Sequence, residues 1–205
     1  MSRFIEAAYE LLFPHPTTLS IVDSIAIRVM EKLHSPYATV EAEFKIFLPR
    51  EAPASKRKSL MPYIASYESV RFQGEAPEHF VEVTVPVTSL CPCSKAISER
   101  GAHNQRGTIS IRALQREGTI LWIEDLVETA EACASSPIYT LLKREDEKRV
   151  TEMAYDNPKF VEDMVRDVAV ALRSDGRIGR LEVTASSEES IHNHQAFASL
   201  EFTRP

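Results

Sequence analysis

Segment 89–106 reads SLCPCSKAISERGAHNQR and contains two of the three cysteines and one of the six histidines of the chain. It lies between two segments of alternating apolar residues, 79–87 and 107–114, which we expect to form strands. A loop between two strands is held rigidly and stays open to solvent, which is typical of functional sites. The segment therefore predicts chemistry at its cysteine and histidine side chains.

Cys91 and Cys93 are separated by a single proline, so they are too close for an ordinary unstrained disulfide. Thiolate is both a nucleophile and a metal ligand, and His103 is able to join either role. A C-x-C pair with a distant histidine matches no standard structural zinc pattern. Three cysteines also imply no disulfide framework, which fits a reducing cytoplasm.

The composition is that of a globular protein with one large domain or two small ones. The chain has 205 residues, of which 43% are hydrophobic and 26% charged. Its net charge of −6 argues against a sequence-independent nucleic-acid binder, although a local cationic cluster would still accept a small anion. The N-terminus lacks a signal-peptide pattern, and no apolar run approaches the roughly 20 residues that cross a bilayer.

Residues 1–73 are predicted to form helix, helix, strand, strand. Apolar residues recur at helical spacing over 2–13 and 17–34 and alternate over 39–48 and 63–73. Residues 74–205 are predicted to form strand, strand, helix, helix, strand, strand, over 79–87, 107–114, 122–134, 157–172, 180–187 and 196–202. The two blocks are similar if the first lacks its opening pair of strands. The charged run 143–150, between the two helices of the second block, is interpreted as a solvated surface turn.

The last predicted loop contains His192 and His194, separated by one asparagine. In a strand, residues two apart share a face, so both imidazoles would point the same way. Taken alone, the pattern favours solvated histidines in a polar hairpin loop. Cys133 lies on an alanine-rich helix face and is interpreted as a small buried hydrophobic residue.

Considered together, these groups indicate a metal site. Cys91, His103, His192 and an acidic residue near 145–147 supply one sulfur, two nitrogens and one oxygen. This mixed set is typical of catalytic zinc, iron or manganese, whereas structural zinc favours closed, sulfur-rich sites. A catalytic metal needs a position for water. Either one of the four groups is therefore a neighbouring acid–base residue, or one ligand dissociates when substrate enters.

Three segments resemble the signatures of the type IB GTP cyclohydrolase I family, the FolE2 family. They are VPVTSLCPCSKAISERGAHNQRG (85–107), LLKREDEKRVTEMAYDNPKFVEDMVRDVA (141–169) and EESIHNHQAFA (188–198). The resemblance extends over the whole chain and is densest after about residue 82. These motifs are long, and their joint presence is highly specific for the family.

The resemblance implies an α+β tunnelling fold, in which each module has an antiparallel sheet and two helices. The chain would contain two modules: 1–73, which lacks its opening hairpin, and 74–205, which is complete and carries the site motifs. Family members normally have about one more N-terminal hairpin, so either the start codon was misassigned or this is a natural short form. Subunits are expected to assemble through their sheets into a homotetramer with sites at subunit interfaces.

The reaction implied is the hydrolysis of GTP to formate and 7,8-dihydroneopterin triphosphate, which opens folate biosynthesis. The metal ligands would be Cys91, His103, Glu147 and His192, with Glu145 as the alternative carboxylate. Zinc, manganese and ferrous iron all suit the family. In this view the protein binds neither nucleic acid nor membrane.

Further roles carried over from the family concern the substrate. Cys93 resembles a second, catalytically important thiol beside the catalytic Cys91 and His103. Glu162 resembles the carboxylate that anchors guanine, since it can accept hydrogen bonds from N1–H and the 2-amino group. Cations near the signatures are candidates for binding the triphosphate, although each is equally well explained as a solvated surface charge: Arg106, Lys143, Arg144 and Lys148.

Three other functions are considered. The first is the archaeal-type relative, which depends on ferrous iron and makes a cyclic phosphate product. The second is a truncated, inactive structural subunit. The third is a structural zinc module that binds protein or nucleic acid, against which the acidic pI of about 5.6 and the mixed ligand set both argue.

Overall fold

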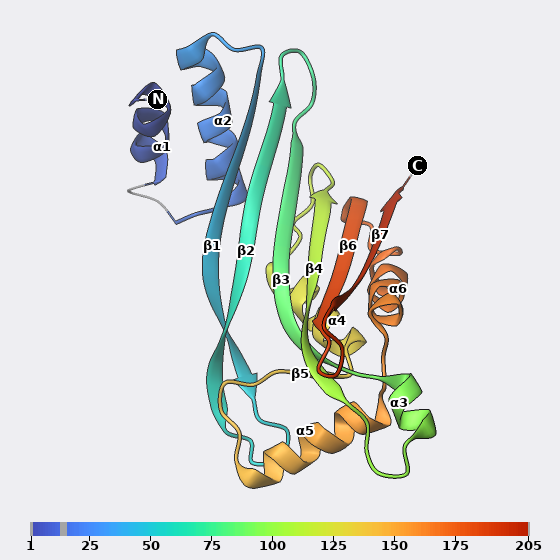
Figure 1. Cartoon of the computed structure of the whole chain (residues 1–205). Coiled ribbons are helices and arrows are strands. Elements are labelled where there is room, and N and C mark those ends of the chain that lie inside the picture. The colour runs from blue at the N-terminus through green and yellow to red at the C-terminus, as the bar shows by residue number, and fades with distance from the viewer. Residues whose placement is uncertain (1, 13–15, 205) are drawn as a thin grey trace.

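The chain forms one antiparallel sheet with helices, as seen in the computed structural model, which describes residues 2–12 and 16–204 (Figure 1). The elements in chain order are α1 (Ser2–Leu12), α2 (Leu19–Leu33), β1 (Tyr37–Glu51), β2 (Lys58–Phe72), β3 (Glu78–Leu90), α3 (Pro92–Ile97), β4 (Asn104–Gln115), α4 (Ile123–Cys133), β5 (Ser136–Pro137), α5 (Arg144–Asp156), α6 (Val161–Leu172), β6 (Ile178–Glu188) and β7 (Gln195–Thr203). Phe13, the last residue of the first predicted helix, lies outside the described residues.

The six long strands lie in the order β1-β2-β3-β4-β6-β7, and the short β5 pairs with β3. Helices α4 and α6 pack on the part of the sheet formed by β3, β4, β6 and β7, whereas α2 packs on β1 and β2 (Figure 1). The predicted α+β class and antiparallel sheet are confirmed. The boundary at 73/74 falls in the turn between β2 and β3, which pair directly, and the division into two modules stays a prediction. Within the described part of the chain, no helix combines the length and apolarity needed to cross a bilayer.

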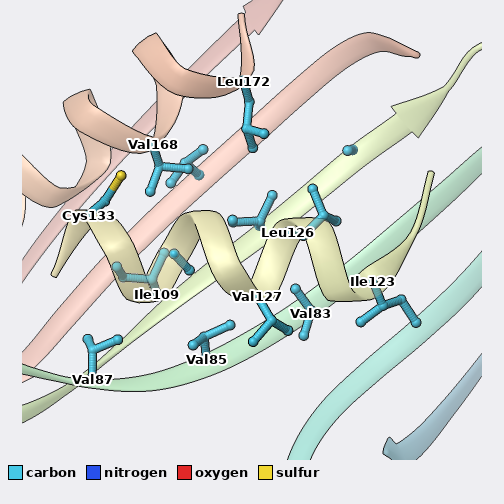
Figure 2. Packing of buried hydrophobic residues seen from close by; sticks show 14 of the residues in the cluster. Val83, Val85, Val87, Ile109, Ile123, Leu126, Val127, Cys133, Val168 and Leu172 are labelled. Carbon is cyan, nitrogen blue, oxygen red and sulfur yellow. The ribbon is translucent and has the colours of Figure 1, made fainter. Parts of the chain in front are cut away.

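The core forms where strands with alternating apolar residues pack against the apolar faces of the helices (Figure 2). Val81, Val83, Val85 and Val87 of β3 are fully buried, because every second residue of a strand faces the same side. The helix residues that cover this face also recur at helical spacing and belong to the same cluster: Leu126, Val127, Ala130, Met164, Val165 and Val168. The same strands and helices therefore hold both the core and the ends from which the site is built.

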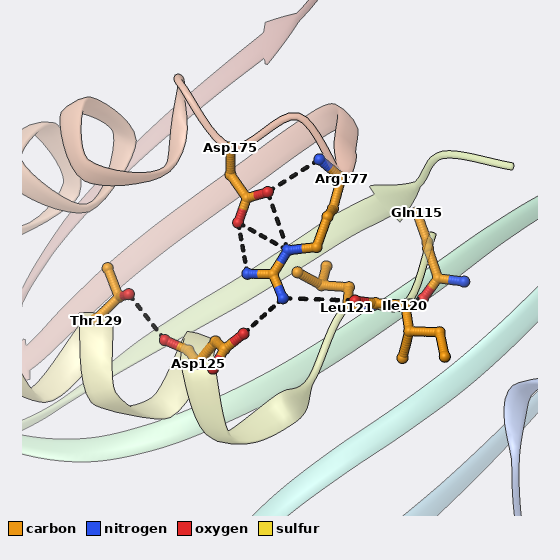
Figure 3. Close-up of polar contacts among 7 residues, drawn as sticks. All are labelled: Gln115, Ile120, Leu121, Asp125, Thr129, Asp175 and Arg177. Atoms are coloured by element: carbon orange, nitrogen blue, oxygen red, sulfur yellow. Dashed lines mark hydrogen bonds and ion pairs between the residues drawn. The ribbon is translucent and has the colours of Figure 1, made fainter. Parts of the chain in front are cut away.

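A polar network joins the helix layer to one end of the sheet (Figure 3). Arg177 lies just before β6. Its guanidinium donates to both carboxylate oxygens of Asp175, and to Asp125 Oδ2 in the first turn of α4 at 2.6 Å. Hydrogen bonds from Arg177 lower the pKa of Asp175, and both carboxylates raise the pKa of Arg177. Nearby, Leu121 N–H donates to Gln115 Oε1 of β4 at 2.9 Å. These bonds fix the start of α4 against the α6–β6 turn and β4.

The charged run 143–150 is helical from Arg144 onward, so its prediction as a surface turn was wrong. It forms the first half of α5, and Lys143 N–H donates to Asp146 Oδ2 at 2.8 Å to cap the helix. Three acidic residues in the first turn complement the positive end of the helix dipole. Most α5 side chains are exposed, so the helix lacks a wide apolar stripe. Helices are predicted from sequence mainly by such a stripe, which is why α5 was missed.

The helix predicted over 157–172 begins later, at Val161. The four residues before it are not helical and are fixed to the sheet instead. Lys159 N–H donates to the Leu90 carbonyl at 3.1 Å, and Asn157 Nδ2 donates to the Ala134 carbonyl at 2.8 Å. This short connection between α5 and α6 thus lies against the end of β3.

Two valines of α6 provide a matched test of this packing. Val168 is fully buried, whereas Val170, two residues on, is 55% exposed. Val168→Ala is expected to lower the free energy of unfolding by about 2–3 kcal/mol, from lost apolar burial and the cavity left behind. Val170→Ala should change it by less than about 0.5 kcal/mol. Urea unfolding of both variants measures the difference, and equal losses would contradict the packing described.

Candidate active site

A cavity of about 200 Å³ opens where the ends of β3, β4, β6 and β7 meet the start of α6. Its wall is made by residues from four separate segments: Ser89, Cys91, His103, Gln105, Lys159, Phe160, Val161, Glu162, Ser187, Glu189, His192 and Ala196. Four of the predicted site residues therefore line one cavity: Cys91, His103, Glu162 and His192.

Cys91 and His103 are held together by the continuation of the β3–β4 ladder. Beyond the last paired residues of the two strands, Cys91 N–H donates to the His103 carbonyl at 3.1 Å. Ser94 closes the loop: its Oγ donates to the Cys91 carbonyl at 3.1 Å and accepts from His103 N–H at 3.2 Å. Ser94 N–H also lies 3.4 Å from Cys91 Sγ. The loop includes the short helix α3. Its hydrogen bonds fix the main-chain positions of Cys91 and His103, from which the thiol and the imidazole project.

His192 enters the cavity from the bend between β6 and β7. Its ring stacks on His194, with centroids 5.2 Å apart and planes 16° from parallel. Two histidines separated by one residue therefore do lie side by side, although the segment between them is a bend and not a strand. Of the two, only His192 is part of the cavity wall.

Three polar residues of the cavity wall were not anticipated from the sequence. Gln105 is buried, and its Oε1 lies 2.8 Å from His103 Nδ1. Lys159 is paired through Nζ with Asp167, and its carbonyl accepts from Ser89 Oγ at 2.9 Å. Glu189 places a carboxylate in the same cavity. A signal existed for Gln105, which is a polar residue at an inward-facing strand position, but nothing local marked Lys159 or Glu189.

The other predicted site residues lie outside this cavity. Cys93 is exposed on α3, and Arg106 is exposed on β4, where its neighbour Gln105 faces the opposite side. Lys148 is 75% exposed and pairs with Glu152 of its own helix at 3.7 Å.

Glu147 is also remote from the cavity, near the start of α5. Tyr155 lies at the far end of that helix. Lys95 Nζ of α3 donates to the Tyr155 carbonyl and lies over the Tyr155 ring. Glu147 and Tyr155 are eight positions apart on α5, or about 12 Å along the axis. Glu147 is not among the residues that line the cavity, and among the described residues it forms no ligand cluster with Cys91, His103 and His192.

Comparison with known proteins identifies the family of the chain. Residues 1–198 match the family model described as type I GTP cyclohydrolase folE2. The chain belongs to the FolE2 family. It is 48% identical over 201 residues to GTP cyclohydrolase FolE2 of Geotalea uraniireducens, covering 98% of this chain and 72% of that protein. It is 46% identical over 201 residues to the Nitrosococcus oceani protein of the same name, covering 98% and 73%.

Solved structures of low sequence identity share the fold. Uricase from Arthrobacter globiformis superposes with a TM-score of 0.54 at 10% identity, covering 98% of this chain and 75% of that chain. Urate oxidase from Bacillus sp. TB-90 gives 0.55 at 8% identity, covering 99% and 78%. The likeness concerns the fold alone and is consistent with a tunnelling-type fold for this FolE2 chain.

The FolE2 cavity is lined by residues of the types that bind divalent metals. Cys91, His103 and His192 offer one sulfur and two nitrogens around a single space, a combination suited to zinc and iron. Among residues 2–12 and 16–204, however, no three cysteine, histidine or acidic side chains already stand at ligand spacing. Two carboxylates also line the cavity, those of Glu162 and Glu189.

The buried acid of the FolE2 signature run is Asp146, between the two glutamates proposed from sequence. Its carboxylate accepts from Ala54 N–H and Ser55 N–H at 2.9 and 2.8 Å and from Ser55 Oγ at 2.6 Å. It also caps α5 through Lys143 N–H. Burial alone would raise the pKa of Asp146, but these hydrogen bonds outweigh burial and hold the pKa well below its usual range. Asp146 therefore anchors α5 to the loop between β1 and β2.

Asp146→Asn is expected to lower the urea midpoint of unfolding at neutral pH, because an amide accepts fewer of these bonds. A lowered folded-state pKa means that the stabilisation is present above the unfolded pKa and disappears as pH falls through the folded one. The difference between the parent protein and the variant should therefore shrink below about pH 4. Urea titrations at several pH values measure it.

Asp156→Asn is the matched control, since Asp156 is exposed at the other end of α5. It should leave the urea midpoint unchanged across the same pH range. An equal loss in both variants, or a difference between Asp146→Asn and the parent that does not depend on pH, would contradict the anchoring role.

Proposed function

We propose that this FolE2 protein hydrolyses GTP to formate and 7,8-dihydroneopterin triphosphate, the first step of folate and pterin biosynthesis, with a divalent metal held by Cys91, His103 and His192. The observation that carries the proposal is the cavity in which these three residues meet Glu162. They come from segments as far as 101 positions apart, so their meeting is a property of the fold.

Guanine binding falls to Glu162, in the first turn of α6. A carboxylate accepts two parallel hydrogen bonds from the N1–H and 2-amino group of guanine, which no other common nucleobase offers. Because Glu162 lines the same cavity as Cys91 and the two histidines, the imidazole ring of the base would face those residues. The carboxylate thus selects the base and orients its C8 carbon.

The chemistry at C8 is hydrolytic. Zinc, manganese or ferrous iron, when bound, would supply a Lewis acid that lowers the pKa of the attacking water. Whichever of His103 and His192 would be held less firmly moves a proton to the ring nitrogen as the C8–N bond breaks. Hydrolysis of the remaining bond releases C8 as formate, and the rearranged sugar closes the second pterin ring. Cys93 is proposed as a second catalytic thiol.

We also propose that a second subunit completes the site. Glu147 is exposed and remote from its own cavity, and Arg106 and Lys148, the candidate cations for the triphosphate, are exposed as well. The outer edges of β1 and β7 have no strand partner within the described chain, so both can pair with another copy. A homo-oligomer, with a tetramer as the expected form, would bring α5 of one subunit to the cavity of its neighbour.

Turnover of GTP by the purified protein tests the reaction. Formate and product mass are followed with zinc, manganese or ferrous iron, and the mass separates the triphosphate product from a cyclic phosphate. Cys91→Ala is expected to lower turnover by about 100-fold or more, since it removes a metal ligand. Cys133→Ala is the control, because that sulfur lies in the core and not in the cavity. Full activity of Cys91→Ala would refute the proposed site, and an inactive parent protein would favour a structural subunit.

Mixed oligomers test the origin of Glu147. Cys91→Ala and Glu147→Ala subunits, each inactive alone, are co-expressed with different tags and purified through both. If Glu147 comes from a neighbour, random mixing leaves about one quarter of the sites intact, so about one quarter of the activity returns.

A mixture of Cys91→Ala with His103→Ala is the control, because both residues line the same cavity of one subunit. It should remain inactive. Failure of the Glu147 mixture to recover activity, with mixed oligomers demonstrated by the two tags, would place Glu147 in its own subunit's site or outside any site.

A further inference from the structure

Gln105 is a buried amide at a position that the strand pattern reserves for apolar residues. It is 7% exposed on β4, in line with the fully buried Ile109 and Ile111. A buried amide is costly unless its donors and acceptors are hydrogen-bonded. The buried amide of Gln105 therefore needs hydrogen-bond partners beside the cavity.

The partners of Gln105 fix the orientation of its amide. Nε2 donates to Glu189 Oε1 at 3.5 Å, and Oε1 lies 2.8 Å from His103 Nδ1. Ser190 Oγ lies 3.5 Å from both Gln105 Oε1 and His103 Nδ1. An ionised carboxylate only accepts hydrogen bonds, so the Glu189 carboxylate must face the NH₂ group of Gln105. In the reversed amide, the Gln105 carbonyl oxygen would face the carboxylate oxygen with no hydrogen between them. The carbonyl oxygen is thereby turned toward the histidine.

This orientation decides which nitrogen of His103 carries the proton. Since the amide oxygen is only an acceptor, the 2.8 Å contact requires a hydrogen on Nδ1. The neutral ring then has its lone pair on Nε2. Only an unprotonated ring nitrogen can bind a metal or take up a proton.

We propose that Gln105, held by Glu189, is a positioning residue that locks His103 in the Nδ1–H tautomer and so presents Nε2 as a free donor for the site. The consequence for metal binding rests on the function proposed above, whereas the tautomer itself does not. A neutral acceptor also fixes the ring without adding charge to a cavity that receives an anionic nucleotide. Hydrogen-bond partners of this kind set both the orientation and the basicity of a ligand histidine.

Nitrogen-15 NMR of the metal-free protein tests the tautomer directly. Histidine is labelled selectively, the spectrum is recorded in mildly alkaline buffer, and the His103 signals are identified by their loss in His103→Asn. The parent protein is expected to show a protonated Nδ1. Gln105→Met, which keeps the length but removes the acceptor, should show a mixture of both tautomers.

Zinc affinity, measured by competition with a chelator, provides the second readout. Gln105→Met is expected to bind zinc about 10–100-fold more weakly. Exchanging the pair, Gln105→Glu together with Glu189→Gln, keeps an acceptor beside Nδ1 and a donor behind it at unchanged net charge. The exchange should restore the single tautomer and bring zinc affinity within a few-fold of the parent.

Gln115→Met is the matched control, because Gln115 lies at the other end of β4 and accepts one hydrogen bond, from Leu121 N–H. It should move neither readout. A parent protein protonated at Nε2 would overturn the proposal even if no variant folded, as would Gln105→Met with unchanged tautomer and zinc affinity. Neither readout uses GTP, so failure of the cyclohydrolase assay would leave this test intact.

Discussion

The antiparallel pairing of β3 with β4 is the constraint on which the site depends. Its hydrogen bonds run from the core valines outward and end in the bond between Cys91 N–H and the His103 carbonyl. A change of one residue in the register would turn the buried side chains of β3 to the other face, at a cost of several kcal/mol of lost burial. The packing of the core therefore also fixes where the thiol and the imidazole lie.

Around this pair, the other site residues arrive on elements that the same sheet supports. β6 pairs with β4 and leads into the bend with His192, and α6 begins beside the end of β3 with Glu162 in its first turn. The Lys159 backbone, bonded to Leu90, ties that helix start to the strand. These hydrogen bonds thus fix the positions of the segments that line the cavity.

Two acidic residues show how the same chemistry serves different ends. Asp146 is buried and satisfied by four hydrogen-bond donors, so it holds α5 in place and is closed to ligands. Glu162 lines the cavity, and its side chain is exposed. Gln105 stands between these cases, since it is buried like Asp146 but uses its bonds to orient His103. Of these two buried polar residues, Asp146 thus anchors a helix and Gln105 orients a residue of the site.

Sequence alone determined the strands, the helices with apolar stripes and the family, because alternation, helical periodicity and long motifs are local properties. It also singled out Cys91, His103, His192 and Glu162. Only the tertiary structure decided that 144–150 is helical, since Asp146 reaches a loop more than 90 positions away for its hydrogen bonds. Only the tertiary structure placed Glu189 and Gln105 in the cavity and Glu147 outside it. Which acid faces a site depends on contacts between distant segments, and no local pattern encodes them.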